Sequence, residues 1–172
     1  ELPVNLPGVT HPVCALSGPN GERLVPGSSL SVLDSPLGRI GVTICNESLY
    51  SDMTRALVQR GADLLVAMSN DGWCRGNVSK RQHFAVSALR AVEAGRNVVV
   101  ANNSGISGIV DPFGRVRNRT EINQATCFTG VTPGRHRSTF YSWYGDVFAA
   151  ACLVLLALLP ILARLPGIRR RA

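Results

Sequence analysis

One cysteine occupies a position typical of a catalytic nucleophile. Cys45 ends the apolar run GRIGVTIC and is followed by Asn46, Glu47 and a predicted helix. A nucleophile on a strand-to-helix turn is exposed at the carboxyl edge of a sheet, and the backbone N–H groups after it are free to hold an oxyanion. Glu47 is close enough to orient the partners of the thiol. A cysteine that ends an apolar strand can equally be a small buried residue, so this pattern alone leaves catalysis open.

The sequence around Cys45 does not supply the base or cation that a thiolate needs. No basic residue lies within a few positions of Cys45, so the activating group must come from elsewhere in the fold. Asn70, Asp71 and Trp73 follow a predicted strand and are expected near the same pocket, although Asp71 could instead cap a turn. His83 is a lone histidine on a predicted helix, and we interpret it as a structural or surface residue.

Apolar runs and turn residues predict an alternation of strands and helices. Residues 29–34 and 39–45 form a hairpin around an SPLG turn, and DPFG at residues 111–114 predicts a second turn between strands. The other predicted elements are a helix at 51–60 between Ser51 and Gly61, a strand at 63–69, a helix at 80–94 before Gly95, and strands at 97–102 and 127–131. The helix at 80–94 places Phe84, Ala88, Ala91 and Val92 on one face. This order is typical of an α/β domain.

Composition excludes several classes of function. The net charge is +7, but four of the arginines lie at the C-terminus (Arg164, Arg169, Arg170 and Arg171). No basic stripe with interleaved aromatic residues is visible, so nucleic acid is not an expected partner. The five cysteines show neither zinc-ligand spacing nor a disulfide framework. We expect no metal and no cofactor.

An uncharged apolar run divides the chain into three parts: a domain at 1–146, a transmembrane helix at 147–163, and a basic tail at 164–172. At about 1.5 Å per residue the run spans about 25 Å, near the lower limit for crossing a bilayer. Trp143 and neighbouring tyrosines precede it and arginines follow it, which predicts a cytoplasmic C-terminus and a domain on the opposite side. The alternative is a buried core helix. Residues 1–29 are rich in Pro, Gly and Ser and are interpreted as a loop or lid.

Three ordered blocks carry a resemblance to a known family: GRIGVTICNES, GADLLVAMSNDGW and RQHFAVSALRAVEAGRNVVVANNSGISGIVDPFGRV. They resemble the C-terminal half of nitrilase-superfamily domains. The FYSWYGD segment and the apolar run extend the likeness to the apolipoprotein N-acyltransferase family. The resemblance implies the C-terminal part of a nitrilase-like α/β/β/α sandwich, followed by one transmembrane helix, at the bacterial plasma (inner) membrane with the catalytic domain on its periplasmic face.

The family's catalytic set is Glu, Lys and Cys, and its nucleophile falls on Cys45, with Glu47 in a supporting position. The implied reaction moves an acyl chain from a phospholipid, through a Cys45 thioester, to the α-amine of a diacylglyceryl-cysteine on an apolipoprotein. The family's base and lysine lie upstream of this chain, so the chain alone is expected to be inactive. Lys80, the only lysine, lies downstream of Cys45 and does not replace the family's lysine. Glu1, in ELPV, is a candidate remnant of a further functional glutamate loop.

Two departures from the family pattern leave other functions open. Asn46 replaces the aromatic residue that usually follows the nucleophile, although its backbone N–H can still serve an oxyanion. Cys74 and Arg75 interrupt the block in which Trp73 is a candidate for lining the acyl groove, beside Asn70. One alternative function is a membrane-tethered nitrilase-type amidase that uses the same Cys45. Another is a non-catalytic relative that binds lipid or lipoprotein.

Overall fold

The computed structural model describes residues 29–36, 38–74, 76–132 and 137–162. The predictions for Glu1, for nearly all of the loop or lid at residues 1–29, for Arg75 and for the basic tail lie outside these residues. The strands are β1 (Val32–Ser35), β2 (Gly38–Ile44), β3 (Leu64–Asn70), β4 (Asn97–Asn103), β5 (Gly108–Val110) and β6 (Val116–Arg119). The helices are α1 (Ser51–Gln59), α2 (Asn77–Ala94), α3 (Phe140–Tyr144) and α4 (Val147–Leu162), with 3₁₀ turns η1 (Cys45–Leu49) and η2 (Asp71–Trp73).

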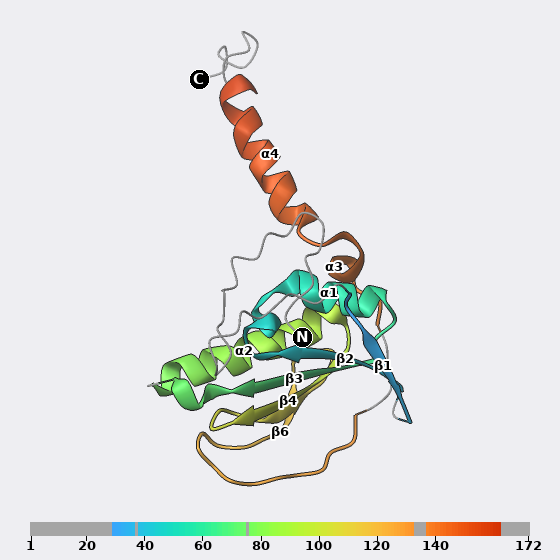
Figure 1. Ribbon diagram of the computed structural model, residues 1–172. Helices are drawn as coiled ribbons and strands as arrows, with labels where there is room; N and C mark the ends of the chain where they lie inside the picture. Colours follow the sequence, from blue (N-terminus) through green and yellow to red (C-terminus); the bar gives the residue numbers. More distant parts are fainter. Residues whose placement is uncertain (1–28, 37, 75, 133–136, 163–172) are drawn as a thin grey trace.

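The six strands form one mixed sheet in sequence order, from β1 to β6. Strands β2, β3 and β4 are parallel, whereas β1 at one edge and β5 and β6 at the other pair antiparallel. Helices α1 and α2 connect the parallel strands and lie together over one face of the sheet (Figure 1). The predicted α/β class and the predicted hairpin at β1 and β2 are therefore confirmed. Because β2, β3 and β4 run in one direction, their carboxyl ends meet at one edge.

The hydrophobic core lies between the sheet and these two helices. Leu65, Ala67, Val98 and Val100 point from the central strands toward Leu57 of α1, which is fully buried. The predicted inner face of α2 is mostly confirmed, since Phe84 and Ala91 are buried and Ala88 is partly buried. Val92 is an exception at 42 % exposure. This core fixes both helices, and with them the loops at the carboxyl edge.

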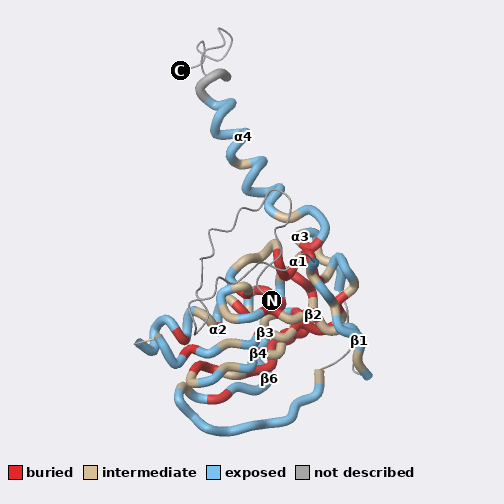
Figure 2. Tube along the Cα trace, viewed as in Figure 1, coloured by how far each residue is buried: buried red, intermediate tan, exposed pale blue. Residues whose placement is uncertain are grey.

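The opposite face of the sheet is also apolar but is only partly covered within the described residues (Figure 2). Val42, Val66 and Val99 are half-buried there, and Ile44 and Met68 are 49 % and 45 % exposed. A strand with apolar residues on both faces is typical of a sheet covered on both sides. The described residues supply one sheet and one helical layer, which is half of the four-layer sandwich expected from the sequence.

The predicted helix at 51–60 is confirmed as α1, but its predicted cap at Ser51, the predicted start of α2 and one predicted strand are wrong. Tyr50 is the N-cap of α1, because Ser51 is already helical. Helix α2 begins at Asn77 rather than at residue 80, directly after the extended backbone of Gly76. Residues 127–131 are exposed and form no strand. The predicted helix stop at Gly95 is confirmed, since its φ of 61° is a left-handed conformation that glycine adopts without steric cost.

Helix α4 extends away from the sheet and its helices (Figure 1), and its apolar side chains are largely exposed. It coincides with most of the predicted membrane segment at 147–163. Within the described residues, however, no helix combines the length and apolar character needed to span a bilayer. The membrane-spanning assignment is therefore not confirmed.

A buried carboxylate organises the turn between β5 and β6. Asp111 is 2 % exposed and accepts hydrogen bonds from the backbone N–H groups of Phe113 (2.9 Å) and Arg115 (3.0 Å). Its other oxygen accepts from the Arg117 guanidinium at 2.8 Å. Burial by itself raises the pKa of Asp111, but these donors outweigh it, so the net pKa is lowered.

We expect Asp111→Asn to reduce the free energy of unfolding by about 1–2 kcal/mol at neutral pH, a modest value because Arg117 is half-exposed. The pKa of Asp111 is lower in the folded state than in the unfolded state. Its stabilisation is therefore present above the unfolded-state pKa and is lost as the pH falls through the folded-state pKa. Denaturant unfolding of both proteins across this range measures the difference. A difference that stays constant as the pH falls would contradict this account.

Candidate active site

Cys45 lies at a strained turn between β2 and η1. Its φ is 55°, a left-handed conformation that non-glycine residues rarely adopt. The cost of such a conformation is about 1–3 kcal/mol, and it persists only where neighbouring contacts enforce it. Strand β2 ends at Ile44, and the chain turns at Cys45 into η1 and then α1. This is the strand-to-helix turn predicted from the sequence, with the cysteine partly exposed at the carboxyl edge.

Two side chains of η1 hold this turn. The Glu47 carboxylate accepts a hydrogen bond of 2.7 Å from the backbone N–H of Ile44. Partial burial raises the pKa of Glu47, and the bond from Ile44 opposes that rise. The buried Ser48 hydroxyl donates to the Cys45 carbonyl at 3.1 Å. Glu47 thus binds the backbone of Ile44, the residue before Cys45, and stabilises the turn.

Asp71, directly after β3, is the centre of a polar network beneath this turn. Its side chain is completely buried. One carboxylate oxygen accepts from the Ser69 hydroxyl at 2.9 Å and faces His83 Nδ1 at 2.9 Å. The other accepts from the Asn102 amide at 2.6 Å. Asp71 therefore joins the ends of β3 and β4 to helix α2.

His83 links this network to Cys45. Its Nε2 lies 3.2 Å from the Cys45 carbonyl oxygen and 3.1 Å from the Ser48 hydroxyl. From the sequence, His83 is interpreted as a structural or surface residue. Its contact with Cys45 is not predicted from the sequence. A lone histidine on a helix carries no spacing signal. The remaining clue is the polar SND segment that follows a buried strand and precedes this helix.

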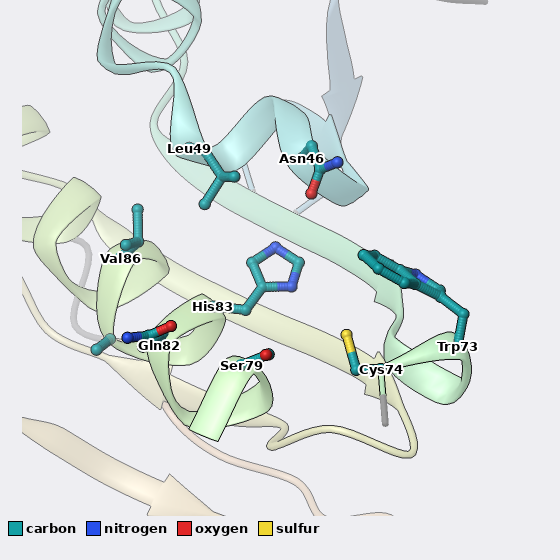
Figure 3. Close-up of a pocket in the computed structure, with 9 residues that line it drawn as sticks. Asn46, Leu49, Trp73, Cys74, Ser79, Gln82, His83 and Val86 are labelled. Atoms are coloured by element: carbon teal, nitrogen blue, oxygen red, sulfur yellow. The ribbon is translucent and has the colours of Figure 1, made fainter. Parts of the chain in front are cut away.

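A pocket of about 510 Å³ opens beside the turn (Figure 3). Asn46 and Trp73, two predicted pocket residues, line it from η1 and η2. The rest of its lining consists of Leu49, Cys74, Ser79, Gln82, His83, Ala85 and Val86. Cys45 itself borders a narrow adjoining space, shared with Ser48 and His83, that admits no water molecule.

The side chains of Asn70 and Lys80 form hydrogen bonds that stabilise loops. Asn70 was predicted near the pocket, but its side chain caps η2 by accepting from the Gly72 N–H at 3.0 Å. The Lys80 ammonium is buried and donates to the Ser104 carbonyl at 3.1 Å and to the Asn123 side chain at 2.9 Å. Both acceptor residues have positive φ angles. Lys80 thus stabilises the loop after β4.

Within the described residues, Cys45, Cys74, Cys127 and Cys152 are all free thiols. Cys74 lines the pocket, and its pKa is raised by burial and by the nearby Asp71 carboxylate. We expect the rate at which iodoacetamide alkylates Cys74 to keep increasing with pH beyond the pH at which free N-acetylcysteine is fully ionised, because the pKa of Cys74 is raised. Peptide mass spectrometry over a pH series measures this rate. If the alkylation rate of Cys74 reached its plateau at the same pH as that of N-acetylcysteine, or at a lower pH, the raised pKa of Cys74 would be contradicted.

Comparison with known proteins identifies relatives of this chain. The carbon-nitrogen hydrolase family matches residues 10–139. Apolipoprotein N-acyltransferase from Geobacter metallireducens is 37 % identical over 80 % of this chain and 26 % of its own length. The same enzyme from Gloeobacter violaceus is 40 % identical over 95 % of this chain and 32 % of its own length. The chain therefore spans about a third or less of these relatives.

Solved structures show the same fold. A carbon-nitrogen hydrolase from Helicobacter pylori G27 matches with a TM-score of 0.54 at 15 % identity, over 59 % of this chain and 43 % of that one. A mutant amidase from Nesterenkonia sp. AN1, with acrylamide added at its active site cysteine, matches with a TM-score of 0.50 at 25 % identity, over 61 % and 44 %. The sheet is thus that of a mixed α/β nitrilase-like fold, and the chain belongs to the carbon-nitrogen hydrolase family.

Proposed function

We propose that this chain is part of a bacterial membrane acyltransferase that transfers an acyl chain from a phospholipid to an apolipoprotein, with Cys45 as the nucleophile. The observation that carries the proposal is the strained Cys45 turn beside a mostly apolar pocket. The similarity to apolipoprotein N-acyltransferases at 37 % and 40 % identity supports the acyl-transfer class. Because the chain spans a third or less of those proteins, the activity belongs to the complete protein.

The pocket chemistry fits an aliphatic chain. Leu49 from η1, Trp73 from η2, and Ala85 and Val86 from α2 offer apolar surface around one cavity (Figure 3). Burying a methylene group in such a site is favourable by about 0.8 kcal/mol. Trp73 is 67 % exposed, so its ring is free to cover part of a bound chain. Asn46, which follows Cys45 in the sequence, adds a polar side chain to the lining of the same pocket.

The reaction has two steps that share Cys45. The thiolate attacks the ester carbonyl of a phospholipid, the lysophospholipid leaves with a proton, and a thioester remains on the enzyme. The α-amine of a diacylglyceryl-cysteine then attacks the thioester, loses a proton and forms an amide as the thiolate departs. The backbone N–H of Asn46 is a candidate donor to the oxyanion of both steps. Glu47 supports them by bracing the turn.

The base and the cation that complete this chemistry are proposed to come from the upstream Glu and Lys of the family. The Lys80 ammonium donates hydrogen bonds to Ser104, in the loop after β4, and to Asn123. Glu1 remains a candidate for a further functional glutamate. The present chain is accordingly proposed to be inactive alone.

The proposed location is the inner membrane, with the α/β domain on the periplasmic side and the C-terminus in the cytoplasm. Helix α4 exposes Phe148, Leu153 and several other large apolar side chains to the surroundings. Phe140, Trp143 and Tyr144 of α3 are each more than 60 % exposed just before it. Aromatic residues at the start of an apolar helix are typical of a membrane interface.

An amidase is the second candidate, because the similar Nesterenkonia structure is an amidase with an active site cysteine. Both reactions pass through an acyl-cysteine, so the acceptor separates them. An acyltransferase passes the acyl group to an amine, whereas an amidase releases ammonia from a small amide and hydrolyses the intermediate. A non-catalytic binding relative would form no acyl-cysteine.

We expect the complete protein in detergent to move a labelled acyl chain from phosphatidylethanolamine to a synthetic diacylglyceryl-cysteine peptide. Cys45→Ala should abolish this transfer and leave the unfolding temperature little changed, because a small partly exposed side chain is removed. Cys127→Ala, which removes a thiol outside the pocket, serves as the control and should retain most of the activity. Mass spectrometry of the peptide reports the product.

Two outcomes would contradict this proposal. Equal loss of transfer in Cys45→Ala and Cys127→Ala would show that the thiol assignment is wrong. Ammonia release from a small amide by the wild type, without peptide acylation, would favour the amidase.

A further inference from the structure

We propose that His83, paired with Asp71, is a positioning residue that holds the carbonyl of Cys45 and thereby fixes the nucleophile in its left-handed conformation. This inference rests on the proposed role of Cys45 as nucleophile, and it concerns the hold of His83 on the Cys45 backbone rather than its place in the pocket lining. It concerns the step in which Cys45 becomes acylated, which an acyltransferase and an amidase have in common.

The first argument is the direction of the hydrogen bonds. An ionised carboxylate only accepts, so the proton of His83 Nδ1 is directed at Asp71. Asp71 is held rigidly for this purpose, because the Ser69 hydroxyl and the Asn102 amide donate to it as well. The imidazole ring is consequently fixed in orientation, with Nε2 facing the Cys45 carbonyl.

The second argument concerns the two groups around that carbonyl. Ser48 has one hydroxyl proton, and the Cys45 oxygen and His83 Nε2 both lie within hydrogen-bond distance of it. If the imidazole is neutral, the Ser48 proton serves either the ring or the carbonyl. If Nε2 is protonated, the ring donates to the carbonyl while Ser48 also donates to it, and every polar group has a partner. In the arrangement in which Nε2–H donates to the Cys45 carbonyl, Ser48 and His83 hold that carbonyl oxygen from two different elements.

The third argument is the strain itself. A φ of 55° at Cys45 needs contacts that enforce it. Glu47 holds the N–H of Ile44, and Ser48 holds the Cys45 carbonyl, but both belong to the same short 3₁₀ turn. His83 is on α2 and is anchored through Asp71 to the end of β3. It ties the turn to the rigid sheet and helix layer, so it limits the movement of Cys45 relative to the pocket.

A pair of substitutions tests this role. The side-chain amide of asparagine replaces Nδ1 of histidine, and that of glutamine replaces Nε2. His83→Gln keeps a donor near the Cys45 carbonyl, whereas His83→Asn keeps only the contact with Asp71. If His83 served only to anchor α2 to the sheet, Asn would be the better replacement. If it positions Cys45, Gln is the better one. Arg81→Gln, on the exposed surface of the same helix, is the control.

The readout is the burst of nitrophenolate when the complete protein in detergent reacts with p-nitrophenyl butyrate. In that reaction the thiol takes the butyryl group and expels nitrophenolate. We expect His83→Asn to slow the burst at saturating ester by about tenfold to a hundredfold, with little change in the half-saturating concentration. His83→Gln should recover most of the rate, and Arg81→Gln should match the wild type. Unfolding temperatures are recorded for every variant.

The outcomes separate this inference from the proposed function. The positioning role would be overturned if both His83 variants showed the burst rate of the wild type. It would also be overturned if His83→Gln reacted more slowly than His83→Asn. The burst rates of the wild type and the variants could follow the expected order while phospholipid fails to acylate Cys45. That result would overturn phospholipid as the donor and leave the positioning role intact. Absence of any nitrophenolate release by the folded wild type would contradict both.

Discussion

The left-handed backbone of Cys45 is the constraint on which the candidate site depends. A φ of 55° turns the chain sharply at the end of β2, so that the thiol lies at the edge of the sheet instead of inside it. Such a conformation is unfavourable by itself and requires support from its surroundings. That support comes from Glu47 and Ser48 within the turn and from His83 across it.

Parallel strand order explains why residues distant in sequence meet here. The carboxyl ends of β2, β3 and β4 lie side by side, which brings Cys45, Asp71 and Asn102 to one edge. Helix α2 begins at that edge and supplies His83 to the network and Val86 to the pocket. The core between the sheet and helices keeps this arrangement rigid, which is what a site built from loops requires.

Much of this organisation could be predicted from sequence because it depends on local patterns. Apolar runs define the central strands, Gly95 ends α2, and the polar residues after Ile44 mark the turn at Cys45. The His83 contact could not be predicted in the same way, since it depends on how α2 docks over the sheet edge. Residues 127–131 resemble a strand in composition, but they pair with none of the strands that the structure describes. Asn70 was placed at the correct edge, yet its side chain is used to cap η2.

The most direct test of the central claim is peptide mass spectrometry of the complete protein after brief exposure to phospholipid, with and without hydroxylamine. The account predicts one acyl adduct, carried by the peptide that contains Cys45 and removed by hydroxylamine, as a thioester is. A folded protein with no adduct, or with an adduct on Cys74 or another residue instead, would contradict it.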